Sequence, residues 1–272
     1  RTELLFTTNR AWVEYQPKGV VGIVAPWNFP VYLAIGPLIT AIAAGNRAMI
    51  KGSEYAPRTN AALQVVLDDA LGSGEVPIIC GDASVAQSFT ALPFDHLIFT
   101  GAPAIAPAVM TAAAAHITPV TLELGGKSPA VIAESANLSK AAACIAHGKL
   151  FNAGQICVSP DYALVPASKV ADFANAMAEA ARRLYPKVAE NADYTQIINE
   201  RQDARIDALV ADAIHKGAQA LTVGGSPAGR RRPLVILTGV TQDMRVLQDE
   251  LFGPILPVVG YESLEDAIAF VR

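Results

Sequence analysis

Cysteine is scarce in this 272-residue chain, which has only three: Cys80, Cys144 and Cys157. A low, odd number argues against a disulfide framework and favours a reducing compartment, so we expect a cytoplasmic protein. Cys80 ends a predicted strand, and Cys144 lies in an alanine-rich predicted helix. We expect both to be buried small hydrophobes, as free cysteines commonly are.

Charge, long apolar runs and histidine clusters are scarce as well. Charged residues make up 17% of the chain and the formal net charge is −4, which gives no electrostatic basis for binding nucleic acid or an anionic membrane. No apolar run reaches the ~18 residues of a transmembrane helix without interruption, and residues 1–4 do not begin a signal peptide. The four histidines lack the spacing of metal ligands, so we expect no metal site.

Apolar strands and helices alternate at close spacing along the first half of the chain. Strands are predicted at 20–25, 48–50, 76–80, 96–99 and 120–122, with helices at 31–44, 57–71 and 109–115 and a short helix capped by Asp82. Each of these strands is apolar on both faces, as a sheet covered by helices requires. Right-handed crossovers then give a parallel, doubly wound sheet and an α/β fold.

The alternation restarts after two glycines at 125–126. The second half is predicted to contain strands at 129–133 and 162–165, helices from Asn137, from Ser168 and through 209–216, and a polar loop at 224–232. We therefore expect two domains, 1–124 and 125–272. The chain does not begin with methionine and ends within a helical pattern, so we expect a fragment of a longer protein.

Two segments whose key residues are 34 positions apart carry candidate chemistry: Glu123 begins Glu-Leu-Gly-Gly-Lys-Ser-Pro, and Cys157 ends Asn-Ala-Gly-Gln-Ile-Cys. A thiol can attack a carbonyl carbon, and a carboxylate can activate water to hydrolyse the adduct. The alternatives are a buried small residue for the cysteine and a solvated charge for the glutamate.

A third segment at 26–30, Pro-Trp-Asn-Phe-Pro, follows the first predicted strand. Ligands of open α/β sheets bind at the carboxyl ends of strands, and the amide of Asn28 is a suitable donor to an oxyanion. The alternative for Asn28 is an ordinary turn residue. Trp27 belongs either to the binding pocket or to the core.

Together these segments resemble the aldehyde dehydrogenase superfamily, and the resemblance runs along the whole chain. It implies a Rossmann-like NAD(P)-binding domain at 1–124 and a catalytic domain at 125–272. It also implies that Cys157 is the nucleophile, that Glu123 is the general base, and that Asn28 forms the oxyanion hole with the backbone N–H of Cys157. Residues 10–18 resemble the last strand of the family's oligomerisation hairpin, and the family's terminal segments on both sides are missing.

The resemblance also implies the cofactor contacts. Lys51 and Glu54 match the family's adenosine-ribose pair, and a carboxylate there favours NAD, with NADP left open. Gly101 and Ala102 match the pyrophosphate turn, which has alanine where serine is usual. Trp27 is assigned to the same cofactor site.

Glu250 and Phe252 lie in a segment, Asp-Glu-Leu-Phe-Gly-Pro-Ile, that resembles the family motif for the nicotinamide riboside. Taken alone, Phe-Gly-Pro is typical of a turn. The resemblance gives it the role of holding the ribose through Glu250 and of packing Phe252 near the ring.

Segments 15–22, 91–96 and 197–201 resemble the branch that contains coniferyl aldehyde dehydrogenases. The implied function is NAD(P)-dependent oxidation of an aromatic or long-chain aldehyde to its acid through a thiohemiacetal and a thioester. Alternatives are a catalytically silent truncated chain that keeps nucleotide binding, and a coenzyme A-acylating dehydrogenase. The implied partner is a small aldehyde, and the full-length parent is expected to be a homodimer or homotetramer.

Overall fold

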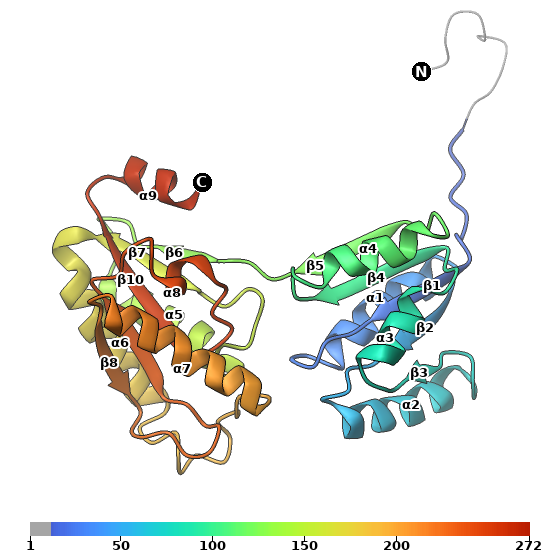
Figure 1. The fold of residues 1–272 in the computed structure, drawn as a ribbon, viewed down its shortest axis with the longest axis horizontal. Coiled ribbons are helices and arrows are strands. Elements are labelled where there is room, and N and C mark those ends of the chain that lie inside the picture. Colours follow the sequence, from blue (N-terminus) through green and yellow to red (C-terminus); the bar gives the residue numbers. More distant parts are fainter. Residues whose placement is uncertain (1–11) are drawn as a thin grey trace, which may run out of the picture. The chain divides into compact units, whose positions relative to one another are not determined.

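The computed structural model describes residues 12–272 and divides the chain into two compact units, Arg1–Leu124 and Gly125–Arg272. We call them the N-terminal and C-terminal units. Each is a five-stranded sheet flanked by helices (Figure 1). The predicted α/β class is therefore confirmed.

The sheet of the N-terminal unit is entirely parallel, as predicted, with the order β3-β2-β1-β4-β5. Its strands are β1 Val20–Val24, β2 Arg47–Lys51, β3 Ile78–Ile79, β4 His96–Gly101 and β5 Val120–Leu124. The order reverses direction at β1, which is the arrangement that places ligands at the carboxyl ends of the central strands.

Within the described part of this unit, four helices cover the sheet: α1 Tyr32–Ala43, α2 Pro57–Leu71, α3 Ala83–Thr90 and α4 Ala106–Ala114. Proline at the first position of α2 suits a helix start because its missing N–H has no partner there anyway. The predicted cap of α3 is confirmed, since the carboxylate of Asp82 accepts from the N–H groups of Ser84 and Val85. The core lies in two clusters, one under α1 and α2 and the other under α3 and α4.

The sheet of the C-terminal unit is mixed, with the order β6-β7-β10-β9-β8. Its strands are β6 Pro129–Val131, β7 Tyr162–Pro166, β8 Gln219–Val223, β9 Leu234–Thr238 and β10 Ile255–Tyr261. Only β8 runs antiparallel to its neighbour. It lies at the edge of the sheet and is largely exposed, as an antiparallel edge strand can be.

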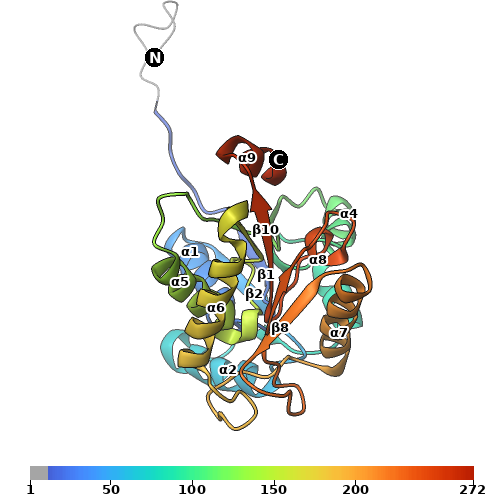
Figure 2. The ribbon, with the colours of Figure 1, turned by 90° about the vertical axis from the view of Figure 1, so that its left-hand side faces the viewer.

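The helices of this unit are α5 Leu138–Leu150, α6 Val170–Leu184, α7 Glu200–His215, α8 Arg245–Gln248 and α9 Leu264–Val271. Short 3₁₀ turns extend α5 at Phe151–Gly154 and precede α6 at Ala167–Lys169. Helices α5 and α6 lie on one side of the sheet, and α7 and α8 lie on the other (Figure 2). One large core cluster fills the space between these layers.

Two sequence predictions are wrong. Cys80 and Cys144, which were expected to be buried, are exposed. Cys80 follows β3 where the chain leaves the sheet. Cys144 lies on the outer face of α5, whose buried residues are Ala142, Ile145, Ala146, Lys149 and Leu150. The strand predicted at 10–18 is not formed over 12–18, where Trp12 and Tyr15 are exposed; positions 10 and 11 lie outside the described residues.

The helices described over residues 12–272 include none with the length and apolarity needed to cross a bilayer.

Candidate functional site

The predicted residues of the N-terminal unit lie along one edge of its sheet. The register pairs Val24 with Lys51 and with Phe99, and it pairs Thr100 with Glu123. Parallel strands in this register end together. The structure therefore brings the loop after β1, the end of β2, the turn after β4 and Glu123 to the carboxyl edge, where open α/β sheets bind ligands.

Asn28 lies in the loop between β1 and α1, four residues after the strand ends. It is half-buried, as is Trp27. It borders a hollow that is almost wholly apolar and is lined by Asn28, Phe29, Pro30, Val31, Tyr32, Ile35, Gly36 and Ile39. The amide of Asn28 is therefore a polar group placed at the end of an apolar surface formed by the first turns of α1.

Lys51 and Glu54 differ in their surroundings. The Lys51 side chain is only 2% exposed, and its Nζ donates to the carbonyl of Gly52 at 2.7 Å. Glu54 is exposed in the turn before α2. Among the ion pairs of the described residues, none joins these two side chains. Each is therefore positioned by its own stretch of backbone.

Gly101 is the last residue of β4, and Ala102 follows it in an exposed turn. Helix α4 begins at Ala106 and has no side-chain cap. At its amino end the N–H groups of Ala106 and Ala108 donate to the carbonyls of Pro103 and Ile105, and Pro107 has no N–H. An anion at this helix start would have to compete with these bonds.

Between α5 and Cys157 the backbone enters the left-handed region of φ and ψ at three consecutive residues. Asn152, Ala153 and Gly154 have φ values of 49°, 52° and 76°. Asparagine tolerates this region, but alanine pays roughly 1–3 kcal/mol for it. A Cβ atom at Gly154 would lie 2.4 Å from the carbonyl oxygen of Gly253, so the absent side chain is what lets the loop pack against the segment after Phe252.

Gln155 anchors this loop from inside the C-terminal unit. It is 2% exposed, and its Nε2 donates to the carbonyls of Asn152 and Gln196, both at 3.1 Å. Its Oε1 accepts from the N–H of Ile198 at 3.0 Å. All three bonds fix the backbone two residues before Cys157, whose side chain is half-buried.

Glu250 lies against the two glycines of the 123–129 motif. Its Oε1 accepts from the N–H of Gly126 at 3.3 Å. A Cβ atom at Gly125 would lie only 2.0 Å from Oε2, so a side chain there would displace the carboxylate from this position. Burial raises the pKa of Glu250, and the Gly126 hydrogen bond acts in the opposite direction.

Phe252 has a φ of 44° and is half-buried. A positive φ is uncommon for an aromatic residue and costs free energy that the surrounding segment must supply. The backbone at this position is therefore held firmly.

The sequence prediction gave no role to four buried or half-buried charged residues that surround the Glu250 segment: Lys127, Lys149, Asp161 and Arg205. Lys127 forms an ion pair with Asp161. Lys149 is fully buried without a hydrogen-bond partner for Nζ, and burial lowers its pKa to about 8. Only Lys127 and Asp161 carried a sequence signal, since each lies four residues after a predicted catalytic residue.

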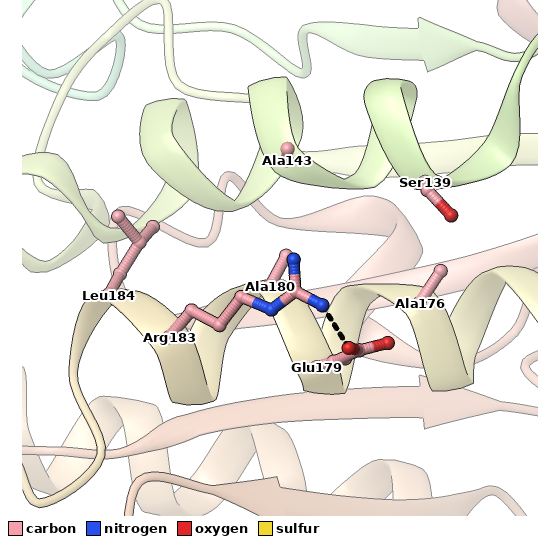
Figure 3. Close-up of a pocket in the computed structure, with 7 residues that line it drawn as sticks. All are labelled: Ser139, Ala143, Ala176, Glu179, Ala180, Arg183 and Leu184. Carbon is pink, nitrogen blue, oxygen red and sulfur yellow. Dashed lines mark hydrogen bonds and ion pairs between the residues drawn. The ribbon is translucent and has the colours of Figure 1, made fainter.

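A second hollow lies between α5 and α6 (Figure 3). Small residues and the ion pair between Glu179 and Arg183 line it. None of the predicted site residues contributes to it.

The Aldehyde dehydrogenase family profile matches residues 2–271. A probable coniferyl aldehyde dehydrogenase of Pseudomonas aeruginosa is 48% identical over 269 residues, which are 99% of this chain and 56% of that protein. Among solved structures, Staphylococcus aureus AldH in its substrate-bound state matches with a TM-score of 0.91 and 37% identity, covering 100% of this chain and 59% of that one. Mycobacterium tuberculosis aldehyde dehydrogenase complexed with NAD⁺ matches with a TM-score of 0.85 and 33% identity, covering 93% and 54%.

Proposed function

Because this chain belongs to the aldehyde dehydrogenase family, we propose that it carries the NAD(P)-dependent oxidation of an aldehyde to a carboxylic acid. The chain spans little more than half the length of the relatives it matches. The observation that carries the proposal is the Cys157 loop, which is pinned by Gln155 and packed through Gly154 against Gly253. A thiol held this firmly beside the Glu250 segment suits attack on a positioned carbonyl.

The residues present fit a nicotinamide dinucleotide. Glu250 accepts a hydrogen bond from Gly126 through Oε1, and a carboxylate has further lone pairs for ribose hydroxyls. Glu250 and Phe252 would hold the nicotinamide riboside, and the remaining cofactor contacts would come from Trp27, Lys51, Glu54, Gly101 and Ala102. When bound, the nicotinamide supplies the hydride acceptor. The carboxylate of Glu54 makes NAD the better fit than NADP.

In the proposed mechanism, the Cys157 thiolate attacks the aldehyde carbon. Nδ2 of Asn28 and the backbone N–H of Cys157 donate hydrogen bonds to the oxyanion. After the substrate carbon has lost its hydride, a thioester to Cys157 remains. Glu123 then takes a proton from water, the hydroxide attacks the thioester carbon, and the acid leaves as the Cys157 thiolate is restored.

The hollow beside Asn28 supports an aldehyde with an apolar body. Its lining from α1 is nearly free of polar groups, so an aromatic or long aliphatic chain would bury apolar area there. We propose aromatic aldehydes such as coniferyl aldehyde, or long-chain aliphatic aldehydes, as substrates. The proposal includes a cytoplasmic location, in keeping with the low cysteine count, and a full-length homodimer or homotetramer.

Two other functions compete with this one. A catalytically silent chain that keeps only nucleotide binding is favoured by Ala102, which stands in the pyrophosphate turn where serine is usual. A coenzyme A-acylating dehydrogenase would pass the thioester to a thiol instead of water. The presence of Glu123 disfavours that alternative because a carboxylate base serves hydrolysis.

The test measures, by absorbance, the reduction of NAD and of NADP in the presence of coniferyl aldehyde or a long-chain aldehyde. It is run on this chain and on a full-length form, each with and without coenzyme A. Turnover without coenzyme A supports the proposal. Turnover that requires coenzyme A supports the acylating alternative, and nucleotide binding without turnover in this chain supports the silent one.

A further inference from the structure

An ion pair joins two motifs of the candidate site. Lys127 lies four residues after Glu123, and Asp161 lies four residues after Cys157. Nζ of Lys127 pairs with Oδ2 of Asp161, and their side chains are 21% and 4% exposed. The pair therefore ties the segment after the proposed base to the segment after the proposed nucleophile, and burial shields it from solvent screening.

The same pair also binds the backbone on both sides of Glu250. Nζ of Lys127 donates to the carbonyls of Val246 at 3.1 Å and Asp249 at 2.9 Å. Oδ1 of Asp161 accepts from the N–H of Leu251 at 2.9 Å. Hydrogen bonds to charged groups are stronger than those between neutral groups, so the residues before and after Glu250 are both firmly held.

Arg205, on α7, also binds the backbone of this segment. Its Nη1 donates to the carbonyl of Glu250 at 3.0 Å, and its Nη2 donates to the carbonyl of Leu251 at 2.5 Å. The stretch 249–251 thus has four backbone groups bound by charged side chains. These bonds fix the backbone that carries the Glu250 side chain, whose Oε1 accepts from the N–H of Gly126.

Asp161 is central because two lysines depend on its charge. Lys149 is fully buried without a hydrogen-bond partner, and both Asp161 and Glu250 stabilise its charged form while Lys127 opposes it. Removing the carboxylate of Asp161 would leave two neighbouring ammonium groups with less compensation. A buried charge that loses its partner is costly, so the cluster would rearrange.

We propose that Asp161, acting through Lys127 and the N–H of Leu251, is a positioning residue for the Glu250 carboxylate. In the proposed function, on which this inference rests, Glu250 holds the nicotinamide ribose. Asp161 would therefore determine the affinity for the cofactor without contacting cofactor or substrate.

The test uses Asp161→Asn in the full 272-residue chain, because asparagine keeps the shape and removes the charge. Amide hydrogen exchange, measured without cofactor, should become about tenfold faster at Leu251 and at Gly126. The KM for NAD should rise about tenfold, with a smaller change in kcat, because misplacement of a binding group weakens the interactions it makes.

The matched control is Asp203→Asn. Asp203 pairs with Arg232 in the same unit, with side chains 11% and 16% exposed, and makes none of the bonds around Glu250. This control should leave exchange at Leu251 and Gly126 and the KM unchanged. Lys127→Met should reproduce the Asp161→Asn result, and Lys127→Arg, which keeps the charge, should restore most of the wild-type exchange.

Unchanged exchange at Leu251 and Gly126 in Asp161→Asn, with a loss of thermal stability equal to that of Asp203→Asn, would overturn the proposal. If Asp161→Asn does not fold, the Lys127→Met and Lys127→Arg pair decides by the same exchange measurement. Absence of NAD(P)-dependent turnover in the wild type would count against the proposed function. The cofactor-free exchange would still decide the positioning role.

Discussion

The two units hold their candidate residues by different means. In the N-terminal unit, the strand register brings Asn28, Lys51, Gly101 and Glu123 to one sheet edge. In the C-terminal unit, Cys157 and Glu250 lie on irregular loops, which are held by a buried amide and by charged side chains. A parallel sheet positions residues through its regular backbone bonds, whereas a loop needs a specific partner for each free backbone group.

The difference also concerns strain and charge. The C-terminal loops include three non-glycine residues with positive φ, Asn152, Ala153 and Phe252, whereas the described part of the N-terminal unit has one, Ile117, in an exposed turn after α4. The C-terminal unit also buries a lysine whose Nζ has no hydrogen-bond partner. Such costs persist only where neighbouring structure imposes them, and they concentrate at functional sites. The comparison therefore predicts that chemistry centred on the C-terminal unit is the more sensitive to single substitutions.

The largest effect is expected from Cys157→Ala. Loss of the proposed nucleophile should lower aldehyde oxidation by about 10⁴-fold or more, measured as the rate of NAD reduction. Thermal stability should remain close to that of the wild type because the side chain is small and half-buried. Cys144→Ala, an exposed thiol of the same unit, is the control and should retain full activity; equal rates in both variants would remove Cys157 from the mechanism.

Glu123→Gln is expected to come next, on the N-terminal side of the comparison. Loss of the proposed base should slow hydrolysis of the thioester by about 10²–10⁴-fold while leaving the first turnover fast. We expect a burst of NADH equal to the enzyme concentration, followed by a slow steady-state rate. A uniform loss of burst and steady rate would instead assign Glu123 to an earlier step.

Asn28→Ala tests a second residue at the sheet edge of the N-terminal unit. Removing one donor to an oxyanion should lower kcat by about 10²–10³-fold with little change in cofactor binding. Because Asn28 lies in a loop after β1, thermal unfolding should change little. An effect confined to the KM for the aldehyde would show that Asn28 serves binding and not the transition state.

The smallest effect is one of stability. Burial lowers the pKa of Lys149 from 10.5 to about 8, so the unfolded chain binds this proton more tightly. Its charge then destabilises the folded chain below pH 8, and the free energy of unfolding should rise with pH up to 10.5, by about 3 kcal/mol in all.

Lys149→Met should remove that rise, and at neutral pH it should raise the free energy of unfolding by up to the same amount. Urea unfolding at several pH values measures it. Lys140→Met, at an exposed position of the same helix, is the control. A rise in stability between pH 8 and 10.5 that persists in Lys149→Met would show that another group is responsible.

The sequence allowed prediction of the sheet of the N-terminal unit and not of the interactions inside the C-terminal unit. Apolar runs determine strands, and strand ends determine the edge that holds Asn28 and Glu123. The exposure of Cys144 was missed because an alanine-rich helix offers little contrast between its faces. Arg205 was missed because no local pattern marks a charged side chain that binds a distant backbone segment. Lys149 was missed because nothing in the sequence around it shows that its position on α5 is buried.

The neighbouring glycines Gly125 and Gly126 look interchangeable in the sequence, yet they differ in what replacing them would do. A methyl group at Gly125 would overlap the Glu250 carboxylate, whereas one at Gly126 would meet no protein atom within 4 Å. In a saturation library scored for NAD-dependent turnover, we expect Gly125 to admit fewer residues than Gly126, because a side chain at Gly125 must displace the Glu250 carboxylate. The difference between the substitutions tolerated at these two positions would thus show which of the two glycines faces the Glu250 carboxylate.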